Sequence, residues 1–399
     1  MEAMREIEAL VAFEGRIAGS DAERRAAEHL AGRLRSLGRE AEVQPISVWP
    51  NYALTHMLHA LLAVVGSLVS VASPLAGVLI VAFALLSAVG DMTGTLFLVR
   101  RLTGRRASQN VVSSEDGDKP GTLVLVAHYD AARAGAIFAP RLAERRAALA
   151  QRLRLPIGLG GAFTIAMLVV LLCTGLRLLG VDSLLVSIVQ FVPTILLVLA
   201  VPALADIQVS SPVPGAADNA SGVAAVLELA RRYGGELDHL DLTVLFTGAE
   251  ESMSLGMREW LRSQRSRLPG ERTLVLNFDK VANGTVRYAA KEGLVVAAAH
   301  DPEIVGICDD IAAGDDGGRF GARPVVGRAT SDALLARARG YRSITLSCLS
   351  ALDYQPNHHQ PTDTPDRVDP EALERALAFS SELIERVDDE LGPELEHPS

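Results

Sequence analysis

The chain has 399 residues, of which 49% are hydrophobic, and a formal net charge of -10 at pH 7. So apolar a composition is unusual for a water-soluble protein and indicates that part of the chain lies in lipid. The negative charge, together with the lack of Lys/Arg runs beside aromatic residues, argues against a nucleic-acid-binding surface. The three cysteines are far apart and form no Cys-x-x-Cys, which indicates neither a disulfide framework nor a cysteine zinc site.

Residues 1–50 have the pattern of a water-soluble helix and strand. Ser20 and Glu23 form a capping box, and the apolar residues that follow recur at helical spacing until Gly38. A strand is expected from about Ala41 to Val48. The N-terminus lacks a basic segment followed by an apolar run, so we expect no cleavable signal peptide.

A long uncharged stretch follows. From Asn51 to Gly90 the chain has no Asp, Glu, Lys or Arg, and Ser73-Pro74 interrupts this stretch near its middle. Each half has the length of about 20 residues that a membrane-spanning helix needs, so a transmembrane hairpin is predicted. A pair of buried core helices is the alternative, and His56, His59 and Asp91 favour it. We assign the two histidines no metal role.

Two strands are predicted next, from Ser108 to Ser113 and from Gly121 to Ala127. The second is continuously apolar, which is typical of a central strand covered on both faces. It ends in His128-Tyr129-Asp130. Because side chains alternate along a strand, His128 and Asp130 point to the same side, as suits a metal-ligating imidazole and a carboxylate that orients it. An ordinary surface histidine is the alternative.

A second hairpin is predicted after a basic segment. The Arg-rich helical stretch from Ala139 to Arg154 can lie on a membrane surface. Leu155 to Leu176 and Ser183 to Ala205 are then uncharged and long enough to span. Because the arginines gather between residues 100 and 154, the positive-inside rule predicts that the polar part of the chain is cytoplasmic.

Each insertion is a hairpin, so all polar segments lie on one side of the membrane and can form one domain. We therefore expect an integral, multi-pass protein of the cell membrane, with the lipid bilayer as a partner. Its discontinuous polar domain would comprise residues 1–50, 101–135 and 207–399, with the first hairpin at 51–100 and the basic amphipathic segment plus second hairpin at 136–206.

Acidic residues recur where later elements begin or end. Asp218 precedes a helix, whose positive end keeps a carboxylate ionised, and Glu250-Glu251 and Asp279 each follow an apolar strand. Open α/β sheets place their sites at the carboxyl ends of strands. Of two adjacent glutamates, one can ligate a cation while the other stays free as a general base. Taken singly, each acid also fits a structural role such as helix capping.

Together these residues, with a histidine near the C-terminus, closely resemble the co-catalytic di-zinc exopeptidases of the aminopeptidase Y, bacterial leucyl aminopeptidase and glutamate carboxypeptidase family. The resemblance covers residues 11 to 50 and 107 to 390, apart from the insertion between Ala131 and Ser211. It implies an α/β fold with a zinc-exopeptidase-like mixed sheet sandwiched by helices. Four transmembrane helices, in two hairpins, are then inserted into this fold.

The resemblance also implies two zinc ions per chain and a peptide substrate. Glu250 would be the general base, and Asp130 would orient His128. Five residues would hold the metals. His128 and Asp279 would bind the first ion, Glu251 and His359 would bind the second, and Asp218 would bridge the two.

Several positions bear on the details of this resemblance. His359 is preferred to His358 because the family's ligand is followed by a turn ending in Asp-Thr, here Asp363-Thr364. Thr330-Ser331-Asp332 matches a family loop. Departures lie at Ala333, where a histidine is common, at Lys280 after Asp279, and at Met257 after Gly256. A cis peptide bond between Asp218 and Asn219 is also expected from the family.

The sequence therefore favours a membrane-anchored zinc aminopeptidase and leaves other functions open. A carboxypeptidase or dipeptidase would need an arginine clamp for the substrate carboxylate. An inactive metal-binding receptor or scaffold is an alternative that the retained Glu250 disfavours. A single-zinc acyl cyclase is disfavoured by the intact His128-x-Asp130. Because the second hairpin lies between Asp130 and Asp218, we hypothesise that the site opens towards the membrane. The alternative is that the hairpin only anchors the protein and the site opens sideways to the cytosol.

Overall fold

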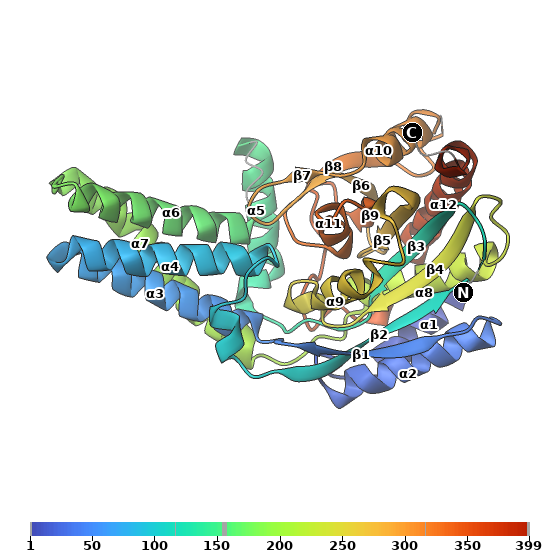
Figure 1. Ribbon diagram of the computed structural model, residues 1–399, viewed down its shortest axis with the longest axis horizontal. Helices are drawn as coiled ribbons and strands as arrows, with labels where there is room; N and C mark the ends of the chain where they lie inside the picture. Colours follow the sequence, from blue (N-terminus) through green and yellow to red (C-terminus); the bar gives the residue numbers. More distant parts are fainter. Residues whose placement is uncertain (1, 116, 154–157, 316, 397–399) are drawn as a thin grey trace.

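The computed structural model describes residues 2–115, 117–153, 158–315 and 317–396. It has two parts, a domain built around one large sheet and a long arm of four helices (Figure 1). Arg154 and the predicted start of the third span at Leu155 fall outside the described residues.

The described residues form a nine-stranded mixed sheet in the order β1-β2-β4-β3-β5-β9-β6-β7, with β8 pairing β6. The central strands β3, β4, β5 and β9 are parallel, so their carboxyl ends lie at one edge. On one side of the sheet β1 is antiparallel to β2, and β2 to β4. On the other side β6 is antiparallel to β9 and β7 but parallel to β8. The strands are β1 (Glu42–Val48), β2 (Arg106–Ser114), β3 (Gly121–His128), β4 (Leu240–Thr247), β5 (Thr273–Phe278), β6 (Thr285–Glu292), β7 (Ala298–Ala299), β8 (Arg323–Gly327) and β9 (Arg342–Leu349).

Helices cover both faces of this sheet, as predicted. Side chains of β3 alternate between the two layers: Leu123 and Leu125 enter the larger core, whereas Val124 and Val126 enter the smaller one. The larger core is closed by α1 (Glu2–Val11), α2 (Asp21–Ser36), α8 (Ser221–Tyr233), α10 (Pro302–Ala313) and α12 (Pro370–Arg386). The smaller core is closed by α9 (Leu255–Gln264) and α11 (Asp332–Arg337). The expected α/β sandwich is confirmed.

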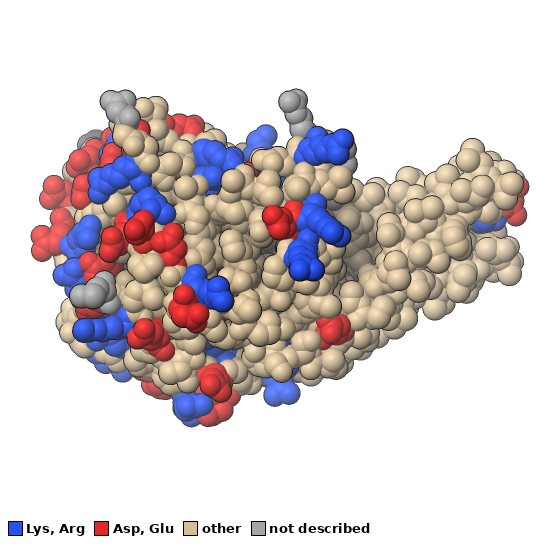
Figure 2. Space-filling view, turned by 180° about the vertical axis from the view of Figure 1, so that it is seen from behind, with Lys and Arg blue, Asp and Glu red and all other residues tan. Residues whose placement is uncertain are grey.

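The arm consists of the four predicted spans, α3 (Tyr52–Ala72), α4 (Pro74–Met92), α6 (Leu159–Leu178) and α7 (Leu184–Val209). All four are long and apolar enough to cross a membrane. Large apolar side chains such as Leu68, Leu86 and Leu184 point outward from the arm, while small ones such as Ala63 and Ala84 pack inside it. On the face shown in Figure 2 the arm is almost free of charged residues except at its far tip. Such a surface suits hydrocarbon better than water.

Short elements join the arm to the sheet domain. The basic helix α5 (Pro140–Leu153) lies where the two parts meet, and none of its described side chains is buried (Figure 1). Turns of 3-10 or π geometry complete the junction and the loops around the strand ends: η1 (Val99–Leu102), η2 (Ala136–Phe138), η3 (Ala216–Ala220) and η4 (Glu250–Ser252).

Candidate metal centre

Three neighbouring strand ends bring imidazole and carboxylate groups together. His128 is the last residue of β3, Glu250 lies in η4 just after β4, and Asp279 follows β5. The buried His128 Nε2 lies 3.4 Å from Asp218 Oδ1, 3.5 Å from Asp279 Oδ1 and 3.7 Å from Glu250 Oε2. The parallel register of the central strands therefore gathers residues that are far apart in sequence.

Hydrogen bonds to Asp363 hold the loop that carries Asp218 in place. The backbone N–H groups of Ala217 and Asp218 donate to the carboxylate of Asp363 at 2.8 and 3.0 Å. The peptide bond between Asp218 and Asn219 is cis, as expected from the family. The Asn219 amide donates to the Phe278 carbonyl at 2.8 Å, which ties the loop to the end of β5.

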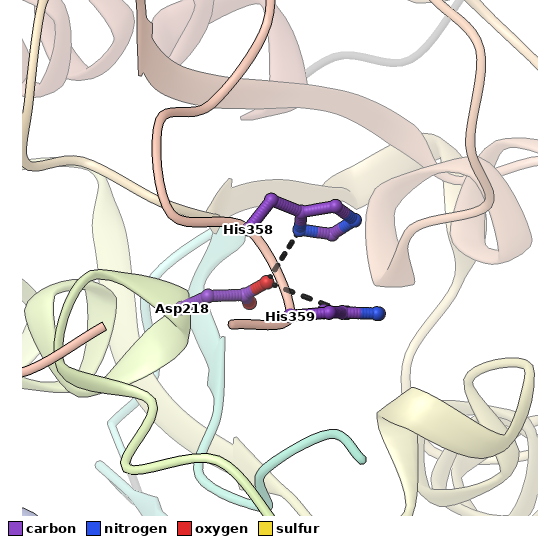
Figure 3. Close-up of side chains that lie close together, drawn as sticks. All are labelled: Asp218, His358 and His359. Carbon is purple, nitrogen blue, oxygen red and sulfur yellow. Dashed lines mark hydrogen bonds and ion pairs between the residues drawn. The ribbon is translucent and has the colours of Figure 1, made fainter. Parts of the chain in front are cut away.

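Two adjacent histidines converge on the Asp218 carboxylate (Figure 3). His358 Nδ1 lies 2.8 Å from Asp218 Oδ2, and His359 Nε2 lies 3.5 Å from the same atom. Only His359 of the pair contacts Glu251 in an ion pair, with Nε2 3.0 Å from Oε2. The His358 side chain is 36% exposed and that of His359 10%. His359 thus links the predicted ligands Asp218 and Glu251, and His358 also lies at the centre.

Asp130 holds the neighbouring turn as well as facing His128. The Nδ1 atom of His128 lies 3.2 Å from the Asp130 backbone oxygen and 3.6 Å from its carboxylate. The same carboxylate accepts the backbone N–H groups of Glu250 at 3.0 Å and Glu251 at 3.2 Å. The strand-end aspartate therefore places both glutamates, a contact that the strand pattern alone did not indicate.

The electrostatics distinguish Glu250 from the acids around it. Burial raises the pKa of Glu250 well above its ordinary value, and Glu251 adds to this, although His128 opposes it. Asp218 is equally buried, but Lys280 and His128 outweigh burial and hold its pKa well below the usual range. The Lys280 ammonium lies 2.6 Å from the Asp279 carboxylate and 3.6 Å from Asp218 Oδ1. Glu250 is thus the site carboxylate best suited to accept a proton.

The donor set fits zinc. His128 Nε2 and Asp218 Oδ1 are buried and have no hydrogen-bond partner among the described residues. Ligand atoms of His128, Asp218 and Glu251 all lie within 4.8 Å of one another, and so do those of Asp218, His358 and His359. Imidazole and carboxylate are ligands that zinc prefers, and a cation would compensate buried atoms that no protein group satisfies.

The structure adds residues that motif reasoning missed. Buried Arg16 donates from Nε to the Tyr129 carbonyl and from Nη2 to the Gly215 carbonyl, so it joins the loops that carry Asp130 and Asp218. Asp332, noted before only as part of a matching loop, accepts the Thr247 hydroxyl at 2.5 Å, and burial raises the pKa of Asp332 to about 6. Arg16 is a single residue without a local pattern, so no motif or periodicity marks it as part of the site.

Comparison with known proteins agrees with this arrangement. Residues 199–384 match the family model described as Peptidase family M28. The probable lipoprotein aminopeptidase LpqL of Mycobacterium tuberculosis is 28% identical over 189 residues, which are 40% of this chain and 37% of that protein. The chain therefore spans little more than a third of the length of this curated relative.

Solved structures share the fold at low sequence identity. A Zn-dependent exopeptidase from Parabacteroides distasonis has a TM-score of 0.54 at 16% identity, covering 97% of this chain and 96% of that one. A glutaminyl cyclase from Tannerella forsythia has a TM-score of 0.56 at 16% identity, covering 96% and 97%. An aminopeptidase from Aneurinibacillus sp. strain AM-1 has a TM-score of 0.54 at 14% identity, covering 96% and 93%. Residues 199–384 are thus similar to peptidase family M28, and the sheet domain has the zinc-exopeptidase fold.

Proposed function

We propose that this protein is a membrane-anchored aminopeptidase that uses two zinc ions. The observation that supports it best is that the adjacent residues Glu250 and Glu251 have different contacts. Glu251 contacts His359 and faces the Asp218 side of the centre, whereas Glu250 faces His128 and has the raised pKa of a proton acceptor. The same turn therefore offers one ligand and one base.

His128 and Asp279 would hold one ion, Glu251 and His359 the other, and Asp218 would bridge them. When bound, the zinc ions polarise the scissile carbonyl and acidify the attacking water. Glu250 takes the proton of that water and returns it to the leaving amine, a task for which a raised pKa is suited. The Ser254 hydroxyl donates to Glu250 Oε1 at 3.0 Å and fixes the carboxylate's direction.

The arm would anchor the enzyme in the cell membrane. Its outward apolar surface would contact the bilayer, and the basic residues of α5 and of the η1 region would lie on the cytoplasmic side with the sheet domain. The discontinuous peptidase domain would then comprise residues 1–50, 101–135 and 207–399.

The start of the second hairpin contacts the metal centre. The Phe138 ring packs edge-on against His359, with ring centroids 4.7 Å apart, and the Ala136 N–H donates to the Asp206 carboxylate at 2.7 Å. The site is therefore next to an apolar side chain and to the end of a span. We infer that it favours peptides with apolar first residues presented near the bilayer.

The test uses full-length protein in detergent. Peptides with a free N-terminus, an acylated N-terminus and an N-terminal glutamine are compared, and the products are identified by mass. The proposal predicts release of the first residue only from free N-termini, loss of this activity on chelation, and recovery with zinc. Release of C-terminal residues would favour a carboxypeptidase. Cyclisation of glutamine without hydrolysis would favour a cyclase, the activity named for one of the structures that share this fold.

A further inference from the structure

A buried arginine connects the first hairpin to the turn that carries Glu250 and Glu251. Arg100 is fully buried, and its Nε and Nη2 atoms lie 2.6 and 2.8 Å from the two carboxylate oxygens of Asp91 in α4. Its Nη1 donates to the Trp49 carbonyl at 3.0 Å and to the Ser252 carbonyl at 2.9 Å. One side chain thus contacts the chain before the hairpin, the end of the hairpin, and the last residue of η4.

The turn needs such support. Ala249, Met253 and Ser254 have φ angles of 53°, 73° and 49° and are not glycines, so both sides of η4 adopt a backbone that side chains disfavour. Conformations of this kind persist only where surrounding contacts hold them.

Contacts hold the turn from two directions. From the strand side, Asp130 accepts the first two N–H groups of the turn. From the hairpin side, Arg100 binds the Ser252 carbonyl, and the Ser252 hydroxyl donates to the Pro50 carbonyl at 2.9 Å. Two of the three η4 residues are therefore fixed by the sheet, and the third by the base of the arm.

The ion pair itself gives a reason to expect a positioning role. A fully buried arginine and carboxylate lose much hydration, and such pairs often contribute little net stability compared with apolar residues of similar size. The planar guanidinium group of Arg100, however, donates hydrogen bonds to the Asp91 carboxylate and to two backbone carbonyls at once. An apolar replacement would leave the Ser252 carbonyl without this donor.

We propose that Arg100, held by Asp91, is a positioning residue for the Glu250–Glu251 turn, and that the first hairpin is a structural part of the catalytic centre as well as an anchor. This inference rests on the proposed function for its kinetic consequences, but not for its structural ones. Misplacing the turn by a fraction of an ångström would shift the base relative to the metals and alter how Glu251 coordinates.

Arg100→Lys tests this, with Arg177→Lys as the matched control. Arg177 is also a buried arginine of the arm, bonded to Gln190 at 3.0 Å, Ser187 at 2.7 Å and Asp182. It belongs to the last turn of α6, and α6 ends far from the sheet domain (Figure 1). Since misplacement of about 1 Å can cost about 100-fold in rate, Arg100→Lys should lower kcat by about 10- to 100-fold with little change in KM. Arg177→Lys should leave both unchanged.

Two further readouts separate positioning from general loss of packing. In protein loaded with Co²⁺, the visible absorption spectrum should change in Arg100→Lys and stay the same in Arg177→Lys, because only the former moves Glu251. Guanidinium ion at low concentration should partly restore kcat in Arg100→Ala by occupying the space beside Asp91, and should leave the kcat of Arg177→Ala unaltered.

Ser252→Ala provides a mild variant that keeps every charge. Loss of one neutral hydrogen bond should lower kcat by about 5-fold in the same direction. Unchanged kcat and Co²⁺ spectra in Arg100→Lys and Ser252→Ala, or equal effects of the Arg100 and Arg177 changes, would overturn the inference. If the wild-type protein hydrolyses no peptide, the proposed function fails, whereas the Co²⁺ spectra still test the positioning role.

Discussion

Asp130→Asn should separate the stability of the catalytic turn from its chemistry. Asp130 is buried and its two carboxylate oxygens accept the N–H groups of Glu250 and Glu251. Asparagine keeps one acceptor and points an NH₂ group at the other N–H, so one hydrogen bond to a charged group is lost. Such bonds contribute about 1.5–3 kcal/mol, and the unpaired donor adds to the loss. If the turn shifts, kcat/KM falls by about 100-fold.

Asp388→Asn is the matched control. The Asp388 carboxylate is also buried and also accepts two adjacent backbone N–H groups, those of Asp238 at 2.7 Å and His239 at 3.0 Å. Asp388 lies in η7 (Val387–Leu391), beside the amino end of β4 and away from the site. Chemical unfolding in detergent should show similar losses of stability for both variants. Kinetics on an aminoacyl reporter should show loss of kcat/KM only for Asp130→Asn. Equal retention of activity by the two variants would refute the role assigned to Asp130.

Three further predictions concern stability, specificity and topology. Burial raises the pKa of Glu23 to about 8, so the folded protein binds a proton at Glu23 more tightly than the unfolded chain does. The free energy of unfolding should therefore fall as the pH rises from about 4.5 to about 8. Unfolding midpoints measured across this range should lose that trend in Glu23→Gln; an unaltered trend would count against it. If the Phe138 ring contacts the first side chain of the substrate with about 1.5 kcal/mol of interaction energy, Phe138→Ala should lower kcat/KM for peptides with an apolar first residue by about 10-fold. Alanyl peptides should be affected less, and equal changes for both kinds of peptide would contradict the proposed contact. Protease added to sealed right-side-out vesicles should spare residues 207–399, whereas digestion from outside would reverse the proposed orientation.

Sequence patterns predicted the elements whose signals are local. Uncharged apolar stretches of about 20 residues predict the four spans, because such stretches are typical of membrane-spanning helices. The structure ends the fourth helix slightly later than predicted, at Val209 instead of Ala205. The apolar strands β3, β4 and β5 were expected because both of their faces are buried. The region from β6 to β8 was not anticipated, because β6 mixes polar and apolar residues and gains its place by pairing with β9 and β8.

The sequence indicated which candidate residues would lie together, but not the contacts that support them. The five ligand positions, Asp130 and Glu250 were named from motif order, and the structure gathers them at one sheet edge. Arg16 and Arg100 were not assigned to the site, because each acts on segments far away in the chain through backbone carbonyls. Such contacts depend on tertiary packing and leave no periodic pattern. The contact between His358 and Asp218 is also not predictable, since two histidines adjacent in sequence need not both reach the same carboxylate.

We propose that two metal ions and a separate base share this site. Metal analysis of purified wild type and of Glu250→Gln, in parallel with turnover on one aminoacyl reporter, tests it most directly. We expect two zinc ions per chain in both proteins and a loss of several orders of magnitude in kcat for the variant. Active wild type with one ion or none would contradict the dinuclear centre, and loss of zinc from Glu250→Gln would contradict the role of Glu250 as a base that does not ligate.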